Sequence, residues 1–368
     1  MRSERGIALI VTMLVVALLT ITVVEFTFSV GVDQRLVRNS LSAMQASMLA
    51  RSGINLGEAV LARDTDKPQA DWYFEDWANP DIAGVITLDP DERLKVQVID
   101  ESGKININRT RGPRVIPGAA PPATPPASKT PAAGASPLTA EAFLRDALRR
   151  LFEAQEVRVG IVDDLVDYWG KSPAPVPGSK QPPPPVEDFR SLEDFGATFG
   201  IPSAKLTKLS KWLTALPVVG AGNDGGKINI NTAPVEVLTA VLNDQQAIQD
   251  IVDRQGAEKP IEEAELKTLL KNVPNEPIMI KLFGTRSSYF RVFASAMVSA
   301  DPTGQRHGGV GQTVVALVQR RPRPNVPPNA PPGTPRWTLT PLDWQKRGGA
   351  ELFAHATEEE RGAAPLDR

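Results

Sequence analysis

The sequence predicts an α+β protein with a long N-terminal helix, a small antiparallel sheet, a large all-helical insertion and a disordered, proline-rich C-terminal tail. Residues 7–62 contain no proline and keep a helical spacing of apolar residues. One run, Arg93–Asp100, alternates apolar and polar residues as a half-buried strand does, and two β-rich runs follow near the end, Phe290–Val298 and Thr313–Arg320. Because strands precede and follow the helical segments, we expect the helices to be inserted between strands of one sheet.

The N-terminal helix begins as a candidate membrane-spanning segment. Ile7–Val24 carries no charged side chain, and its eighteen residues fall within the roughly 17–25 that cross a bilayer. The preceding residues include Arg2 and Arg5, so the positive-inside rule predicts a cytoplasmic N-terminus. By itself this segment could be a plain single-pass anchor. It could also be a secretory signal peptide cleaved near residues 29–31, but the apolar run is long for a signal peptide.

Amphipathic segments predict the helices of the insertion. Thr139 is a favourable helix cap, and Glu141 lies in the first turn that would follow it. The four segments are residues 139–155, 161–169, 191–199 and 203–216. Proline-rich stretches cover residues 113–137, 173–185 and 322–341, which indicates linkers with little to bury and, for the last stretch, the start of a disordered tail over residues 322–368.

A six-residue motif, GKININ, occurs twice. Its glycine, lysine and asparagine residues are Gly103, Lys104, Asn106 and Asn108 in the first copy and Gly226, Lys227, Asn229 and Asn231 in the second. In each copy a glycine turn leads into a short strand, and the asparagine amides can satisfy neighbouring backbone groups. We interpret the copies as paired strand ends that bracket the insertion, with Thr232 as the cap of a helix that follows the second copy.

Composition argues against an enzyme and against a dedicated nucleic-acid binder. The chain has 41 basic and 43 acidic side chains, so it lacks a strong positive field. It has no cysteine, which excludes disulfides and thiolate metal sites. Its two histidines, His307 and His355, lie outside patterned elements and leave little room for histidine catalysis. We therefore expect a structural protein without catalytic residues and without a required cofactor or metal.

The basic leader, Gly6 at its end and the long half-apolar helix resemble the N-termini of type IV pilins and type II secretion pseudopilins. The resemblance implies cleavage after Gly6 by a prepilin peptidase and a methylated Ile7 as first mature residue. Most members carry a glutamate at the fifth mature position, where this chain has Val11. The chain resembles the protein K family of minor pseudopilins in three respects. It lacks this glutamate, it has a helical insertion, and an Asn-Thr-Ala element follows the insertion.

That family resemblance implies most of the functional expectations. It implies a subunit at the pseudopilus tip that initiates assembly and supports export of folded proteins across the outer membrane. It implies minor pseudopilins I and J, the prepilin peptidase and the inner-membrane assembly platform as partners. The expected location is the cell inner membrane, with a cytoplasmic N-terminus and the bulk of the chain periplasmic. The expected division is a leader (1–6), the helix (7–62, transmembrane to about 27), a pseudopilin domain (63–110 and 220–321), the insertion (111–219) and the tail.

Two further expectations concern ligands. Calcium is possible by resemblance, but the acids that family members often show after the second inserted helix are missing here, where residues 169–173 read WGKSP. Asp163, Asp164 and Asp167 remain nearby, and a solvated helix face explains them better than a metal site does. The second motif copy also resembles the opening of helix-hairpin-helix domains, so an alternative function is a type IV pilus or competence-type single-pass protein that contacts DNA. The acids that follow make nucleic-acid binding an unfavoured alternative.

Overall fold

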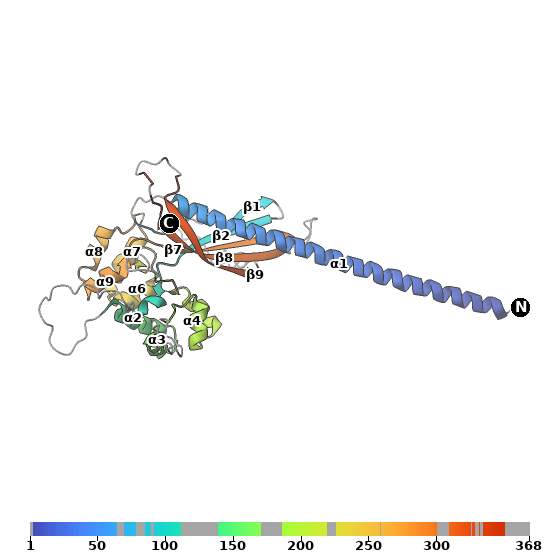
Figure 1. The fold of residues 1–368 in the computed structure, drawn as a ribbon, viewed down its shortest axis with the longest axis horizontal. Helices are drawn as coiled ribbons and strands as arrows, with labels where there is room; N and C mark the ends of the chain where they lie inside the picture. The colour runs from blue at the N-terminus through green and yellow to red at the C-terminus, as the bar shows by residue number, and fades with distance from the viewer. Residues whose placement is uncertain are drawn as a thin grey trace, which may run out of the picture.

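The computed structural model describes residues 3–64, 70–78, 85–89, 92–111, 139–170, 186–218, 226–257, 259–299, 309–324, 326–327, 331 and 334–349. The described chain has three parts: a rod-like helix, a sheet against the C-terminal half of that helix, and a group of helices at one end of the sheet (Figure 1). The linkers predicted at residues 113–137 and 173–185, and both histidines, lie outside the described residues.

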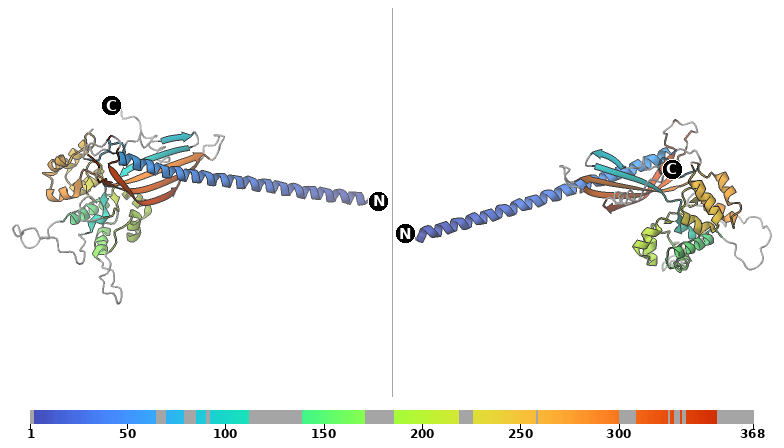
Figure 2. Two further views of the ribbon diagram at one scale, coloured as in Figure 1. Left: turned by 45° about the horizontal axis from the view of Figure 1, so that its top comes forward. Right: turned by 180° about the vertical axis from the view of Figure 1, so that it is seen from behind.

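The predicted N-terminal helix is confirmed as α1, Ser3–Arg63. At 1.5 Å per residue its 61 residues extend about 90 Å. Its first half projects beyond the rest of the molecule in every view (Figure 2), and its second half crosses one face of the sheet. Ala46, Ala50, Ile54 and Leu61 are fully buried there against the sheet. The second half of α1 therefore belongs to the core of the sheet domain.

The sheet has five antiparallel strands in the order β1-β2-β7-β8-β9. The strands are β1 (Val85–Asp89), β2 (Glu92–Asp100), β7 (Tyr289–Ser299), β8 (Gly309–Pro322) and β9 (Trp337–Gly348). Val96 pairs with Ala294, and Ala294 pairs with Val314, so these three residues face α1 together. The three strands predicted from the sequence are confirmed, and β1 is an additional strand that the sequence did not indicate.

The C-terminal strand corrects the prediction of a disordered tail. β9 lies inside the proposed tail region and pairs along its whole length with β8, from Pro322–Trp337 to Gln312–Gly348. Its proline-rich approach suggested an irregular segment, but the strand is held by tertiary contacts that composition does not reveal. Residues 350–368 lie outside the described chain.

The helices lie between β2 and β7 and form two copies of one plan. Each copy starts with the GKININ motif, continues through two helices, a loop and two more helices, and ends in a two-residue strand parallel to the motif strand. The first copy contains β3 (Ile105–Asn106), the 3-10 helix η1 (Ile107–Thr110), α2 (Ala140–Ala154), α3 (Ile161–Gly170), α4 (Leu192–Phe199), α5 (Ser203–Leu209) and β4 (Leu213–Thr214). The second contains β5 (Ile228–Asn229), α6 (Val235–Leu242), α7 (Gln245–Gln255), α8 (Glu263–Leu270), α9 (Glu276–Leu282) and β6 (Phe283–Gly284).

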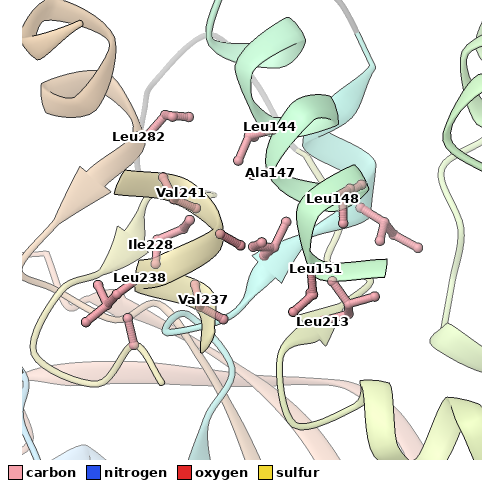
Figure 3. Packing of buried hydrophobic residues seen from close by; sticks show 14 of the residues in the cluster. Leu144, Ala147, Leu148, Leu151, Leu213, Ile228, Val237, Leu238, Val241 and Leu282 are labelled. Atoms are coloured by element: carbon pink, nitrogen blue, oxygen red, sulfur yellow. The ribbon is translucent and has the colours of Figure 1, made fainter. Parts of the chain in front are cut away.

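These two repeats change the predicted boundaries of the insertion. Both repeats share one hydrophobic cluster, in which the α2 residues Leu144 and Leu148 and the α6 residues Val237 and Val241 are buried (Figure 3). The insertion therefore extends from the end of β2 to the start of β7, and not only over residues 111–219. The interpretation of the two motif copies as paired strand ends is also corrected, because the motif strands do not pair with each other. Each pairs with the last strand of its own repeat.

Most of the predicted helix ends are accurate. Thr139 caps α2 and Ser191 caps α4, each accepting a hydrogen bond from a backbone N–H three residues on. The predicted helix 203–216 ends early, because Leu213–Thr214 forms β4 beside the first motif copy. The prediction that Thr232 caps a helix is wrong: α6 begins at Val235 without a side-chain cap, and the Thr232 hydroxyl bonds to Asp100 instead.

Candidate functional site

The residues predicted to be processed lie at the free end of α1. Gly6 is in its first turns, and Ile7 and Val11 are 60% and 53% exposed. Ile7–Val24 has no charged side chain and is exposed on all sides, and the helix from Ile7 is long and apolar enough to cross a membrane. A helix that is apolar on all sides is buried either in a protein core or in a membrane. No other part of the described chain covers this stretch, so a membrane fits it better.

The second half of α1 has two opposite apolar faces. One lies on the sheet, where Gly53 and Gly57 let the helix approach closely: a Cβ atom at Gly57 would lie 2.6 Å from Val292 Cγ1. The other face points away from the sheet and carries Leu41, Met44 and Met48, which are 57%, 62% and 60% exposed. With Val37 these three follow the i, i+4, i+7, i+11 spacing of a single stripe. We call Val37, Leu41, Met44 and Met48 the outer stripe.

The motif asparagines clamp backbone groups inside the repeats. Asn108 accepts a hydrogen bond from the Phe189 N–H at 2.9 Å and donates one to the Phe189 carbonyl at 2.9 Å. Asn231 likewise accepts a hydrogen bond from the Ile261 N–H at 2.8 Å and donates one to the Ile261 carbonyl at 3.1 Å. Phe189 and Ile261 occupy equivalent loops before the third helix of each repeat. The prediction that the asparagines satisfy backbone groups is therefore confirmed for both copies.

The first asparagine of each motif differs between the copies. Asn106 stays within its repeat: its amide donates to the Leu216 carbonyl at 3.1 Å and its oxygen accepts from the Leu216 N–H at 3.1 Å. Asn229 reaches out of its repeat, with its amide donating to the Asp71 carbonyl at 2.9 Å and to Ser287 Oγ at 2.7 Å. The second copy thus fastens the repeats to the sheet domain.

The glycines of the motifs mark where the two repeats touch. A Cβ atom at Gly103 would lie 2.6 Å from the Thr232 carbonyl oxygen, and one at Gly226 would lie 2.4 Å from Arg109 Cδ. Arg109 also donates to the Gly226 carbonyl. Each motif glycine therefore faces the other repeat. A Cβ atom at Gly103 would collide with backbone, whereas one at Gly226 would displace the Arg109 side chain. Lys227 lies over Gly284 of β6, within its own repeat.

Two adjacent carboxylates at the end of β2 connect the sheet to the repeats, a feature that the sequence analysis missed. Asp100 accepts hydrogen bonds from Ser287 Oγ at 2.5 Å, Thr232 Oγ1 at 2.5 Å and the Ser102 N–H at 2.7 Å. Burial raises its pKa to about 6, against the opposing effect of these donors. Apart from the nearby Ser102, its partners come from the second repeat and from the residues before β7.

Glu101 makes the corresponding contacts to the first repeat. Its Oε1 atom accepts from Lys104 Nζ at 2.8 Å and from Arg291 Nε at 2.9 Å, and its Oε2 atom accepts from Thr214 Oγ1 at 2.6 Å. Burial alone raises the pKa of Glu101, but Lys104 and Arg291 lower it to about 2. Asp100 and Glu101 with these partners form what we call the junction. The predicted motif residues Lys104, Asn229 and Thr232 meet here or beside it.

Two groups of acidic residues in the described part of the chain are paired with arginine side chains. Asp163 pairs with Arg149 and Asp164 with Arg158, each at 2.6 Å and on the exposed surface. A second group, Asp64, Asp71 and Glu75, has one carboxylate oxygen from each residue within 4.8 Å of the others. There Arg320 donates to both aspartates, so this group is built around a guanidinium. Calcium prefers six to eight oxygen ligands, and in both groups arginine side chains already pair with carboxylate oxygens.

Comparisons with known proteins agree with the fold and with the predicted resemblance. No family model matches the chain. The chain is 28% identical over 274 residues to type II secretion system protein K of Pseudomonas aeruginosa, an alignment that covers 70% of this chain and 74% of that protein. In fold it is similar to a chain in the crystal structure of the GspK–GspI–GspJ complex from the enterotoxigenic Escherichia coli type 2 secretion system, with a TM-score of 0.55, 15% identity, and coverage of 85% of this chain and 99% of that chain. Both comparisons confirm that this chain is similar to protein K of type II secretion systems, a minor pseudopilin.

Proposed function

We propose that this chain is the minor pseudopilin at the tip of a type II secretion pseudopilus, where it initiates assembly and supports the export of folded proteins across the outer membrane. It is a structural subunit without catalytic residues of its own. Prepilin peptidase cleaves it after Gly6, and α1 holds it in the inner membrane, with the sheet and the repeats in the periplasm. The inner-membrane assembly platform then receives it at the start of filament growth. The similarity to protein K in sequence and fold supports this proposal.

The observation that carries the proposal is the outer stripe of α1. All four of its side chains stay more than half exposed although α1 is fixed on the sheet by its opposite face. Exposed apolar stripes of this length on a fixed helix indicate an interaction surface. The stripe lies on the same helix as the uncharged run Ile7–Val24, so a partner helix that follows α1 would bury both. The minor pseudopilins I and J are the partners we propose, because the similar fold comes from a complex of GspK with GspI and GspJ.

Val11 supports a place at the end of the filament. An ionised carboxylate in an apolar helix bundle costs several kcal/mol unless a partner charge compensates it. A subunit with valine at this position needs no such partner from a neighbouring subunit. A subunit that closes a stack, and does not continue it, has this property.

The test is co-purification of the full chain with cognate minor pseudopilins I and J from detergent-solubilised membranes. The double variant Met44→Glu, Met48→Glu places two charges in the proposed helix interface, and we expect at least a tenfold loss of association. Gln45→Glu is the matched control, because it lies one residue along and about 100° around the helix from Met44. The proposal is contradicted if the full chain does not associate with I and J, or if the double variant binds as well as the control.

The alternative of a DNA-contacting hairpin gains no support from the structure. α6 and α7 do form a helical hairpin, joined at Asn243 and Asp244. In such hairpins a phosphate lies at the helix N-terminus, where free backbone N–H groups bind it. Here Asp244 caps α7 by accepting a hydrogen bond from the Ala247 N–H at 3.0 Å. The chain's own carboxylate therefore occupies the position that a phosphate would need.

A further inference from the structure

A cavity of about 550 Å³ lies between the sheet and the first repeat. Its floor is the face of the sheet turned away from α1, with Phe293 of β7 and Ile99 of β2. Its wall is the pair α4 and α5, with Leu192 and Leu206. Pockets of 300–1,000 Å³ are typical of binding sites for small ligands or side chains. The cavity is separate from the outer stripe, which lies on the opposite side of the sheet.

One exposed aromatic side chain, Tyr73, lines the cavity. Among the described residues outside α1, six large apolar side chains are exposed: Tyr73, Phe74, Val218, Val235, Leu342 and Trp344. Tyr73 lines the cavity, and Phe74 follows it in the chain; they are 52% and 56% exposed. Tyr73 is held in place, since its hydroxyl donates to the Thr232 carbonyl at 2.8 Å. Fixed, exposed aromatic side chains beside a cavity are typical of protein-binding sites.

The charges around the cavity favour an acidic ligand. Four basic and three acidic side chains line it, and two of the basic ones, Lys104 and Arg291, pair with Glu101. Two of the acids, Asp100 and Glu101, are the buried carboxylates of the junction and already accept hydrogen bonds from several donors. The remaining acid, Glu193, is exposed at the mouth. Lys211, also exposed at the mouth, has no ion-pair partner among the residues that the structure describes, and Arg347 of β9 extends into the same lining.

From this combination we propose that the cavity binds an extended segment of a partner protein in which a bulky apolar side chain lies next to acidic residues. The apolar side chain fills the space between Phe293 and Leu206 and packs against Tyr73. The flanking carboxylates pair with Arg347 and Lys211 at the mouth. Because the cavity connects the sheet with the first repeat, the bound segment contacts both. This surface is independent of the outer stripe, so the periplasmic part of the chain offers a second attachment point beyond the proposed filament contact.

The absence of cysteine allows a direct test with the full chain in lipid nanodiscs. Thr207 lines the cavity and is exposed, so Thr207→Cys can be labelled with an environment-sensitive bimane group. The probes are three blocked pentapeptides: an acidic one with two apolar anchors (Glu-Phe-Glu-Leu-Glu), a basic one (Lys-Phe-Lys-Leu-Lys) and an anchor-free one (Glu-Ala-Glu-Ala-Glu). We expect a saturable fluorescence change with the first peptide, and binding at least tenfold weaker with the other two.

Two variants on one strand identify the site. Arg347→Glu removes a charge-assisted contact and is expected to weaken binding of the acidic peptide about tenfold. Lys346→Glu makes the same change one residue earlier, where alternation along the strand places the side chain on the opposite face of the sheet. It is expected to leave binding within about twofold, since its charge acts only at a distance. The proposal is overturned if the acidic peptide does not bind, if all three peptides bind alike, or if the two variants weaken binding equally.

Discussion

The indole ring of Trp337 covers the guanidinium group of Arg320, with 4.3 Å between Arg320 Cζ and the ring centroid. Trp337 is the first residue of β9, and its Nε1 atom also donates to the Asp64 carbonyl at 3.1 Å, just past the end of α1. Arg320 in turn donates to the carboxylates of Asp64 and Asp71 and contacts the Phe290 ring at 4.7 Å. This arrangement fixes the start of the last strand to the end of the first helix.

We predict that Trp337→Ala loosens β9 from the sheet. The variant loses a desolvated cation–π contact, a hydrogen bond and buried aromatic area, which together cost about 2–4 kcal/mol. The measurement is the free energy of unfolding together with the rate of proteolysis within residues 337–348. Trp344→Ala is the matched control, because Trp344 lies on the same strand but is 45% exposed. Equal effects of the two substitutions would argue against an anchoring role for Trp337.

The clamps made by Asn108 and Asn231 lead to a second prediction. Asn231→Ala leaves the Ile261 N–H and carbonyl group without partners in a buried loop, at a cost of about 2–4 kcal/mol. Asn108→Ala does the same to Phe189. We expect hydrogen–deuterium exchange to rise first in α8 and α9 for the former variant and in α4 and α5 for the latter. Uniform loss of protection over both repeats in both variants would show that the clamps do not act locally.

The elements with strong periodic patterns were predictable from the sequence. α1 carries an apolar pattern over most of its length, β2 alternates apolar and polar residues, and β7 and β8 are rich in aromatic or β-branched residues. β9 was not predictable, because its attachment depends on Trp337 meeting Arg320, a contact between residues that no local pattern connects. The end of α5 was misjudged for a related reason: Leu213 continues the helical spacing but pairs with Ile105 of β3.

The functional surfaces were predictable only in part. The GKININ repeat was visible as a repeat, and the backbone role of its asparagines followed from their chemistry. The junction was not visible, since Asp100 and Glu101 are ordinary acids at a strand end until the fold buries them. One signal was available: two adjacent acids directly before a glycine motif, at the point where a strand must meet an inserted domain. The cavity depends on Arg347 of the unpredicted β9 and on Tyr73, so no local sequence pattern indicated it.

The close approach of α1 to the sheet provides a third prediction. Gly53→Leu places a side chain where a Cβ atom alone would lie 2.7 Å from the Ala294 Cβ and 2.8 Å from Leu94 Cδ1. We expect α1 to be displaced from the sheet, with a loss of stability of about 3 kcal/mol or more. Gly31→Leu is the control, because a Cβ atom there has no neighbour within 4 Å and a leucine favours helix. Similar unfolding midpoints for the two variants would contradict the packing described for Gly53.

The fourth prediction concerns proteolytic cleavage of the chain after Gly6. Gly6→Val is expected to block cleavage, so the chain recovered from the membrane keeps Met1, whereas the unaltered chain begins at methylated Ile7. Intact-mass spectrometry distinguishes the two forms. Gly31→Val, the same change within α1 but away from the proposed cleavage point, should leave processing unchanged. A mature unaltered chain that still begins at Met1, or that begins beyond residue 30, would exclude the proposed processing.

The buried acids predict how stability depends on pH. Burial raises the pKa of Glu75 to about 8, and the nearby carboxylates of Asp64 and Asp71 contribute to the rise. In the unfolded chain this pKa is near 4.5. The folded protein therefore keeps a proton on Glu75 that the unfolded chain releases. Protonated Glu75 therefore makes its full contribution to the free energy of unfolding below about pH 4.5, and this contribution is lost as the pH rises through 8.

Glu75→Gln removes this titration and keeps an oxygen that accepts from Trp77 Nε1, a hydrogen bond of 2.7 Å in the unaltered protein. We expect the variant to be more stable than the unaltered chain by on the order of 2 kcal/mol at pH 8.5, after allowance for partial exposure, and nearly equal to it at pH 5. Unfolding free energies measured at pH 5, 6.5 and 8.5 give the comparison, with Glu153→Gln on the exposed face of α2 as the control. Asp100, whose pKa is raised to about 6, adds a parallel loss of stability between about pH 4 and 6 in both proteins, so only the difference between them reports on Glu75. A difference that stays constant from pH 5 to pH 8.5 would show that Glu75 is ionised throughout this range and that Arg320 compensates all three carboxylates.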